Sequence, residues 1–334
     1  MRAEPNFLEL IGRFAGKRML VIGDLMLDEF TWGRVSRISP EAPVPVVSVT
    51  GESEYPGGAA NVARNLREFT SETFVMGLVG ADPHGQNLIG LLEAAGIGTT
   101  GVLQDSNAAT TVKTRVIARN QQVVRVDRER KTILTSDQLG HAREYLEHAI
   151  PRMDGVVVAD YGKGFLTQPL ADEICRLARR HAKVLAVDPH PHTSLVWRGA
   201  TAIKPNRIEA FTAVGLPPAD PVEPACRDEA LLEAARRLNQ LWETRSLLVT
   251  LGEQGMLLFD GEAEPVHLPA RAHEVFDVSG AGDTAIALFT LGLVAGATPA
   301  GAAELANRAS GIVVGKIGTA TVTPAELIAA FEPA

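Results

Sequence analysis

Several features are scarce in this sequence, and each scarcity excludes a class of function. Two cysteines, Cys175 and Cys226, occur in 334 residues, too few for a disulfide framework or a multi-thiolate metal site and typical of a reducing compartment. Aromatic residues make up 5% of the chain, and 40 Asp and Glu outnumber 32 Lys and Arg, for a formal net charge of −8. Without a basic surplus or many stacking side chains, we expect no binding to nucleic acid.

Long uninterrupted apolar runs are also scarce. Charged residues such as Glu9 and Arg13 interrupt the first twenty positions, so no secretory signal is expected. Residues 284–303 carry no charge and are long enough to span a bilayer. However, Pro299 would break a continuous helix there, and we expect a buried helix over residues 283–295 followed by a turn. The sequence therefore predicts a cytoplasmic protein that does not contact membranes.

The chain alternates between apolar runs of strand length and longer segments of helical period. Strands that are apolar throughout are buried on both faces, as in a parallel sheet covered by helices. The pattern predicts one doubly wound α/β domain over residues 1–334, with ligands bound beyond the carboxyl ends of the strands. Expected strands are 18–23, 155–160, 183–188, 201–204 and 246–250, and expected helices are 86–95, 168–181, 207–214 and 228–243.

Two segments depart from this alternation. Residues 36–50 and 108–127 are rich in β-branched side chains, and the second contains a turn near residues 119–122. Such patterns predict antiparallel strands that leave the main body. They form either a small β lid over a pocket or a simple edge hairpin.

The most informative motif is the run Asp277-Val-Ser-Gly-Ala-Gly-Asp283, which precedes an apolar helix. Gly280, Ala281 and Gly282 permit close approach of a ligand to the backbone, and free N–H groups at a helix start bind phosphate. Asp283 falls in the first helical turn. One interpretation is that it merely stabilises the helix start, where an acidic residue is favoured. A carboxylate beside a phosphate is repulsive unless it has a task, such as accepting a proton from an attacking hydroxyl.

Three weaker motifs surround it. The run 204–209 places Asn206 and Glu209 on one face of a helix start, as a capping pair or as a contact to phosphate and hydrated Mg²⁺. The glycines of residues 250–255, directly after a strand, suit either a nucleotide site or an ordinary turn. Residues 57–61 (GGAAN) form another small-residue loop before a helix, suited to substrate contact or to helix packing.

Two other patterns are set aside. The literal dinucleotide fingerprint at residues 96–101 follows a helix and precedes a strand, the reverse of what its mechanism requires. The histidines of residues 188–192 lie among prolines, outside the usual zinc spacings, and we expect no resident metal site.

Together these motifs resemble the ribokinase (PfkB) family of carbohydrate kinases. The 277–283 run resembles the second signature of that family, and Gly57, Gly58 and Asn61 resemble the first, in the family's order along essentially the whole chain. A narrower resemblance is to the branch that phosphorylates heptose 7-phosphates. It is carried by residues 23–28, 36–47, 113–115, 119–122 and 160–164.

The resemblance implies a ribokinase-like fold and roles for particular residues. Asp283 would be the general base. The nucleotide would be bound by Asn206, Arg207, Ile208, Glu209, Thr250, Gly252, Gly255, Gly280, Ala281 and Gly282. The sugar would be bound by Asp28, Gly57, Gly58 and Asn61, with Lys113, Arg115 and Lys163 as candidate cations for its phosphate; a merely solvated basic lid face is the alternative for these three.

The implied reaction uses ATP and Mg²⁺ to convert heptose 7-phosphate to heptose 1,7-bisphosphate for the lipopolysaccharide core, and it leaves a monovalent-cation requirement open. The resemblance is to a stand-alone kinase that lacks the nucleotidyltransferase fused in many relatives, and it implies a homodimer through the β lid. Two alternatives stay open: a kinase of the same fold acting on ribose, fructose, a fructose phosphate or a nucleoside, and a non-catalytic sugar or nucleotide sensor.

Overall fold

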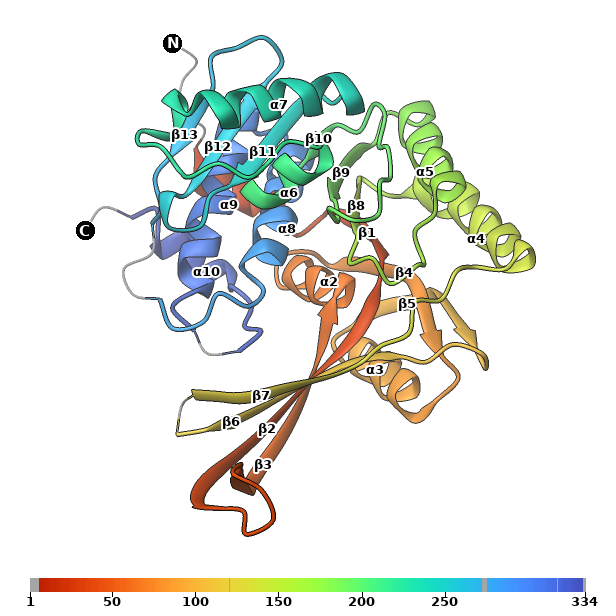
Figure 1. The fold of residues 1–334 in the computed structure, drawn as a ribbon. Helices are drawn as coiled ribbons and strands as arrows, with labels where there is room; N and C mark the ends of the chain where they lie inside the picture. Colours follow the sequence, from red (N-terminus) through yellow and green to blue (C-terminus); the bar gives the residue numbers. More distant parts are fainter. Residues whose placement is uncertain (1–5, 120, 272–274, 317, 333–334) are drawn as a thin grey trace.

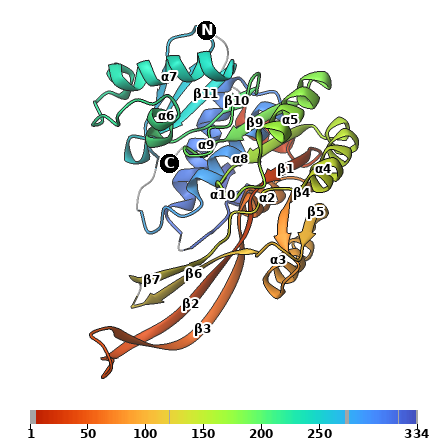
Figure 2. The same ribbon diagram turned by 45° about the vertical axis from the view of Figure 1, so that its right-hand side comes forward.

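The computed structural model describes residues 6–119, 121–271, 275–316 and 318–332. They form an α/β body from which a second, smaller sheet projects (Figures 1 and 2). In the body sheet the strand order is β13-β12-β11-β10-β9-β8-β1-β4-β5, parallel from β5 to β11 and antiparallel at β12 and β13. The strands are β1 (Arg18–Gly23), β4 (Glu72–Gly80), β5 (Ile97–Asp105), β8 (Gly155–Ala159), β9 (Val184–Asp188), β10 (Ala202–Ile203), β11 (Ser246–Thr250), β12 (Met256–Asp260) and β13 (Val266–Leu268).

Helices cover both faces of this sheet because side chains alternate along each strand. In β1, Val21 packs into one apolar core, whereas Leu20 and Ile22 pack into the other. The first core involves α1 (Phe7–Gly12), α2 (Ala59–Arg67), α3 (Pro83–Ala94), α8 (Ala281–Val294), α9 (Pro299–Val313) and α10 (Pro324–Ala329). The second involves α4 (Ser136–Ala149), α5 (Gln168–Arg180), α6 (Arg207–Ala213) and α7 (Glu229–Trp242). The predicted doubly wound α/β fold is confirmed.

The predicted strands and helices are all present, and most shifts at their ends are of one or two residues. The helix expected from residue 86 begins earlier, at Pro83. Asp82 caps it by accepting the N–H of Gly85 at 2.8 Å, and proline is favourable at a first helical position. The apolar run after Asp283 forms α8, which ends at Val294. Within the described residues, no helix combines the length and apolar character needed to traverse a bilayer.

The second sheet is a lid with strand order β3-β2-β6-β7. Its strands are β2 (Leu25–Ile38), β3 (Pro45–Gly58), β6 (Thr111–Ala118) and β7 (Gln121–Arg128). The β2–β3 and β6–β7 pairs are antiparallel, and β2 pairs with β6 in parallel. It is a separate sheet and not an edge hairpin.

The predicted lid range of 36–50 was too short, because β2 and β3 together extend from residue 25 to residue 58. The first four residues of β2, Leu25–Asp28, are all buried. They therefore lack the alternation of apolar and polar side chains by which a half-exposed strand is recognised.

Candidate active site

Five parallel strands bring polar residues to one edge of the body sheet. The carboxyl ends of β1, β8, β9, β10 and β11 lead into or end at Asp24, Asp160, Asp188, Lys204 and Thr250, respectively. Ligands bind at this edge in open α/β sheets. The N-terminus of α8 lies in front of it (Figure 1).

The start of α8 has the geometry of an anion site. Gly280 is its N-cap and has φ +81°, a left-handed conformation that favours glycine. The N–H of Ala281 donates to the Val278 carbonyl at 3.3 Å, whereas the N–H groups of Gly280 and Gly282 have no backbone acceptor within the described part of the chain. Two of the three predicted amides are thus available to a phosphate at the positive end of the helix.

Asp283 lies in the first turn of α8, and both of its carboxylate oxygens are held. Asn61 Nδ2 of α2 donates to Oδ2 at 2.7 Å, and the hydroxyl of Tyr161 donates to Oδ1. Asn61 is itself oriented by Arg64, whose Nη1 lies 3.4 Å from Asn61 Oδ1. Residues from two parts of the sequence far from Asp283 therefore fix the orientation of this carboxylate.

A buried ion pair lies next to this carboxylate. Lys204 Nζ is 3.0 Å from Asp188 Oδ1, and Lys204 is 3% exposed. A Cβ atom built on Gly282 would lie 3.6 Å from the Lys204 ammonium. Lys204 therefore adds a positive charge beside the open amides of α8.

Burial raises the pKa of Asp283 to about 6. The hydrogen bonds from Tyr161 and Asn61 counteract this increase, whereas the negative charge of Asp188 adds to it and Lys204 opposes it. Burial likewise raises the pKa of Asp188 to about 6, against the lowering effect of Lys204. A carboxylate with a pKa near 6 is ionised at neutral pH and is a stronger base than an ordinary aspartate.

The predicted nucleotide residues divide into two groups. Thr250, Gly252, Gly255, Ala281 and Gly282 line one cavity of about 460 Å³, together with apolar side chains that include Val275, Val278 and Ala285. A mostly apolar cavity that opens beside a helix N-terminus suits a base with attached phosphates. Gly280 adjoins the cavity as the helix cap.

The second group lies at the start of α6. Asn206 and Glu209 form a capping box: Glu209 N–H donates to Asn206 Oδ1 at 2.9 Å, and Asn206 N–H donates to Glu209 Oε2 at 2.7 Å. Arg207 is placed elsewhere, because its guanidinium pairs with Asp228 at 2.7 Å and donates to the Ala219 carbonyl. Ile208 is 64% exposed. None of these four residues lines the 460 Å³ cavity: Glu209 lines a separate cavity beside Pro189 and His190, and Arg207 makes a structural contact.

The predicted sugar residues lie on the inner face of the lid and at its base. Asp28 is 4% exposed and pairs with Arg115 Nη1 at 2.6 Å across β2 and β6. A Cβ on Gly57 would lie 2.4 Å from Asp28 Oδ2, so a larger residue there would displace that carboxylate from its present position. Gly58 has φ +57° and leads directly into α2, which carries Asn61.

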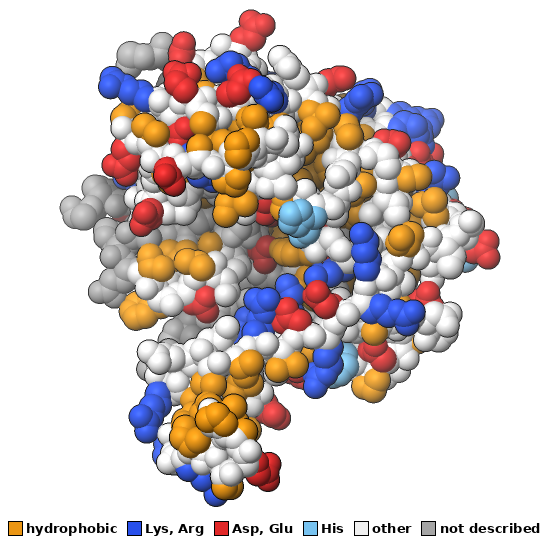
Figure 3. All heavy atoms as spheres, viewed as in Figure 1, with side chains coloured by type: hydrophobic (Ala, Val, Ile, Leu, Met, Phe, Trp, Pro, Cys, Tyr) orange, Lys and Arg blue, Asp and Glu red, His pale blue; other side chains and the backbone are white. Residues whose placement is uncertain are grey.

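The three predicted phosphate cations have different partners. Arg115 pairs with Asp28, and Lys163 Nζ pairs with Glu129 at 2.6 Å. Lys113 Nζ lies 6.0 Å from the centre of the Tyr161 ring, and no carboxylate within the described ranges is within ion-pair distance of it. Burial and the charge of Lys163 lower the Lys113 pKa. Lys113 is therefore the best placed of the three to receive an anion. Figure 3 shows Lys and Arg side chains gathered near the base of the lid.

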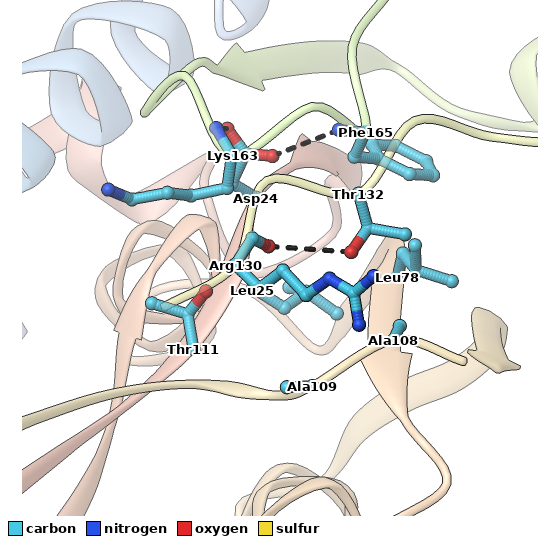
Figure 4. A pocket seen from close by; sticks show the side chains of 10 residues that line it. All are labelled: Asp24, Leu25, Leu78, Ala108, Ala109, Thr111, Arg130, Thr132, Lys163 and Phe165. Atoms are coloured by element: carbon cyan, nitrogen blue, oxygen red, sulfur yellow. Dashed lines mark hydrogen bonds between the residues drawn. The ribbon is translucent and has the colours of Figure 1, made fainter. Parts of the chain in front are cut away.

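The loop that carries Tyr161 and Lys163 is anchored by Asp24. Asp24 is 2% exposed and accepts the N–H groups of Tyr161 at 2.9 Å, Lys163 at 3.1 Å and Phe165 at 3.3 Å. Figure 4 shows Asp24, Lys163 and Phe165 around a small cavity where the body meets the lid. Thr132 lines the same cavity, and its N–H donates to the Lys163 carbonyl at 3.0 Å.

Sequence reasoning assigned no role to Tyr161, Asp24, Asp188 or Lys204. A signal for each exists, because Asp24 and Lys204 directly follow apolar strands, Asp188 ends one, and Tyr161 lies one residue beyond the residue that follows β8. Site residues of α/β sheets gather at these strand ends. The histidine loop at residues 188–192 brings no metal cluster: nowhere in the described residues do three His, Cys, Asp or Glu side chains converge as metal ligands.

The comparisons with known proteins agree with this geometry. Residues 17–326 match the model of the pfkB family carbohydrate kinases. The chain belongs to this family. It is therefore a sugar kinase, and the predicted recognition and enzyme class are confirmed.

Curated relatives are similar over nearly the whole chain. The bifunctional protein HldE of Desulfatibacillum aliphaticivorans is 45% identical over 323 residues, or 96% of this chain and 64% of that protein. HldE of Geobacter sulfurreducens is 43% identical, with 97% and 64% covered. HldE of Helicobacter pylori is 42% identical, with 93% and 65% covered. The chain thus spans a little under two thirds of these relatives.

Solved structures share the fold at low sequence identity. Phosphofructokinase-2 from Escherichia coli in complex with potassium has a TM-score of 0.73 at 18% identity, with 94% of this chain and 97% of that chain covered. Ribokinase from Giardia lamblia has a TM-score of 0.73 at 20% identity, with 95% and 98% covered. The ribokinase-like fold and its lid are thereby confirmed.

Proposed function

We propose that this kinase transfers the γ-phosphoryl group of ATP to the anomeric hydroxyl of D-glycero-β-D-manno-heptose 7-phosphate. The product, heptose 1,7-bisphosphate, would serve synthesis of the lipopolysaccharide core. The observation that carries the proposal is a partly buried carboxylate, Asp283, beside open amides at a helix N-terminus, with the ammonium of Lys113, which has no ion-pair partner among the described residues, facing the ring of Tyr161. The similarity to HldE proteins supports heptose phosphate as the acceptor.

In this mechanism Asp283 accepts the proton of the sugar's anomeric hydroxyl while the oxygen of that hydroxyl attacks the γ-phosphorus. A bond forms between that oxygen and phosphorus, the bond to the β,γ-bridging oxygen breaks, and ADP leaves. The N–H groups of Gly280 and Gly282 and the Lys204 ammonium would stabilise negative charge on the transferring group. Positioning and electrostatic stabilisation dominate phosphoryl transfer, so a preorganised cradle of this kind suits the reaction.

Glu209 and Asn206 fit a role beside hydrated Mg²⁺. Oxygen ligands and retained waters are what Mg²⁺ prefers, and Glu209 uses Oε2 for the Asn206 N–H, which leaves Oε1 for a further contact. Bound with ATP, Mg²⁺ would neutralise phosphate charge. Asn206 and Glu209, which follow β10, would hold the water shell of the bound Mg²⁺. Assays in sodium and potassium salts test whether the reaction also requires a monovalent cation.

The acceptor can be identified with a panel of sugars. Purified protein is offered heptose 7-phosphate, heptose, ribose, fructose, fructose 6-phosphate and a nucleoside, and ADP release is followed. We expect kcat/KM to be highest for heptose 7-phosphate. A higher value for any other member would replace heptose 7-phosphate as the acceptor, and no turnover with any member would favour a sensor.

Replacing Lys113 by alanine is expected to raise KM for phosphorylated sugars more than for their unphosphorylated counterparts. A charge-assisted hydrogen bond contributes about 1.5–3 kcal/mol, so kcat/KM for the sugar phosphate should fall about 10- to 100-fold. Lys183→Ala is the matched control, because Lys183 precedes β9 at the opposite edge of the sheet. Equal losses with phosphorylated and unphosphorylated sugars would contradict the assignment.

We also propose that the chain forms a homodimer through the lid. Ile38 and Val49 are 61% and 55% exposed on β2 and β3, and Val124 and Val126 of β7 are 47% and 45% exposed. Figure 3 shows apolar side chains gathered at the free end of the lid. Large apolar side chains exposed on a projecting sheet are typical of an interaction site. Analytical ultracentrifugation should give twice the chain mass, and a monomer at assay concentrations would contradict the proposal.

A further inference from the structure

Tyr161 occupies a central position in the site. It follows β8 and the buried Asp160, and its hydroxyl donates to Asp283 Oδ1. Its main-chain N–H donates to Asp24 at 2.9 Å, and its ring faces the Lys113 ammonium at 6.0 Å. Tyr161 therefore contacts the candidate base with its hydroxyl and lies under the candidate phosphate cation with its ring.

The geometry points to Tyr161 as a positioning residue for the kinase reaction: its hydroxyl sets the orientation and basicity of Asp283 before the acceptor sugar is deprotonated. This inference rests on the proposed role of Asp283 as the base. Asp283 removes the proton of the acceptor sugar, and Tyr161 acts on the reaction indirectly, through its hydrogen bond to that carboxylate.

The first argument is geometric. A carboxylate has about four lone-pair positions on two oxygens. Asn61 uses one on Oδ2 and Tyr161 uses one on Oδ1, which fixes the rotation of the carboxylate and leaves the others for the acceptor hydroxyl. Without Tyr161, the described contacts leave Asn61 as the single side-chain donor to Asp283, and one hydrogen bond permits rotation.

The second argument concerns charge. The groups that face Asp283 are the neutral donors Tyr161 and Asn61, the carboxylate of Asp188 and the ammonium of Lys204. Burial and the nearby carboxylates, Asp283 foremost, raise the pKa of Tyr161 well above its ordinary value. Tyr161 thus stays protonated and acts as a hydrogen-bond donor, which stabilises the ionised form of Asp283.

The third argument is that the donor is held in place from outside the site. Asp24 accepts three main-chain N–H groups of the loop that carries Tyr161. Because Asp24 holds the main chain of this loop, the Tyr161 hydroxyl can keep a nearly constant distance to Asp283. Catalysis requires such narrow positional tolerance.

The test is Tyr161→Phe, which removes the hydroxyl and keeps the ring under Lys113. The wild-type enzyme should lose kcat/KM as the pH falls below about 6, because protonation of Asp283 removes the base. In Tyr161→Phe this acidic limb should move about one to two pH units higher, since a lost hydrogen bond to a charged group is worth that much in pKa. At its pH optimum, kcat should fall about 10- to 100-fold with little change in KM for ATP.

Tyr145→Phe is the matched control, because Tyr145 is a half-buried tyrosine on α4 that lies outside the site. It should leave both kcat and the acidic limb unchanged. A fall of kcat in Tyr161→Phe with the limb in its original place would overturn the proposal, as would an unchanged kcat with folding confirmed by circular dichroism.

A readout that does not require turnover separates this inference from the proposed substrate. Carbon-13 NMR of aspartate-labelled protein, with Asp283→Asn used to assign the resonance, reports the titration of Asp283 directly. An upward shift of that titration in Tyr161→Phe supports the role of Tyr161 even where heptose 7-phosphate proves not to be the acceptor. An unshifted titration overturns it even where heptose 7-phosphate is turned over.

Discussion

Replacing Asp283 by asparagine should lower kcat by about 10²- to 10⁴-fold or more, because an amide cannot accept the proton of the attacking hydroxyl. Binding of ATP should persist, since the open amides of Gly280 and Gly282 and the apolar cavity beside them are unchanged. The measurements are kcat from ADP release and nucleotide affinity from displacement of a fluorescent ATP analogue.

Asp172→Asn is a suitable control for this variant. Asp172 is an exposed aspartate on α5 whose carboxylate accepts a hydrogen bond from Gln168 in the same helix. It should keep wild-type turnover. If purified Asp283→Asn turned over the sugar at a near-normal rate, Asp283 would not be the base, and the proposed mechanism would fail with it.

Replacing Lys204 by methionine should strongly destabilise the fold. Methionine matches the length of lysine but leaves the carboxylate of Asp188, which is 16% exposed, without its partner, and loss of one partner of such a pair costs up to about 3–5 kcal/mol in the free energy of unfolding. The double variant Asp188→Asn with Lys204→Met removes both charges and should recover much of that loss. Urea denaturation monitored by tryptophan fluorescence measures the free energy of unfolding of the wild type and both variants.

The destabilisation by Lys204→Met should also depend on pH. The pKa of Asp188 is already raised to about 6 by burial, and loss of Lys204 raises it further. A carboxyl group whose pKa is raised in the folded state favours folding at low pH, and this contribution is lost as the pH rises through the folded pKa. The decrease in the free energy of unfolding caused by Lys204→Met should therefore be smaller at pH 5 than at pH 8. Lys316→Met, which breaks the partly exposed Lys316–Glu326 pair, should cost about 1 kcal/mol or less at either pH.

An equal loss at pH 5 and pH 8 would show that Lys204 acts through its packing and not through its charge. A double variant no more stable than Lys204→Met alone would support the same conclusion. The two comparisons thus separate electrostatic stabilisation of Asp188 from the contribution of the lysine side chain itself.

The parts of the fold that could be predicted are those whose signal is local. Runs such as residues 18–23 and 246–250 are apolar apart from residues at their ends because both faces of those strands are buried, and both are strands with the predicted bounds. The helix start within residues 277–283 could also be predicted, because small residues before an apolar helical segment indicate a helix start from local sequence alone. The lid was underestimated where burial on both faces removes the alternation of β2.

The parts of the site that were missed depend on contacts across the sequence. Tyr161 and Asp283 are 122 positions apart, and Asp24 and Tyr161 are 137 apart. No pattern within a window of residues reports such a pair. Arg207 was included because it lies between Asn206 and Glu209, yet a helix turns about 100° per residue, and its side chain leaves that face to pair with Asp228.

The way in which the lid joins the body limits how the lid can move. One residue, Asp24, separates β1 from β2, and none separates β3 from α2. The main-chain N–H of Asp24 donates to the Ala159 carbonyl, and the Asp24 carbonyl accepts from the Ala59 N–H. These bonds and the short connections restrict movement of the main chain at this junction. The two remaining crossings, at residues 106–110 and 129–135, are longer. A change in the opening of the lid must therefore come from flexing along the length of β2 and β3, which makes the displacement smallest beside Asp283 and largest at the far tip.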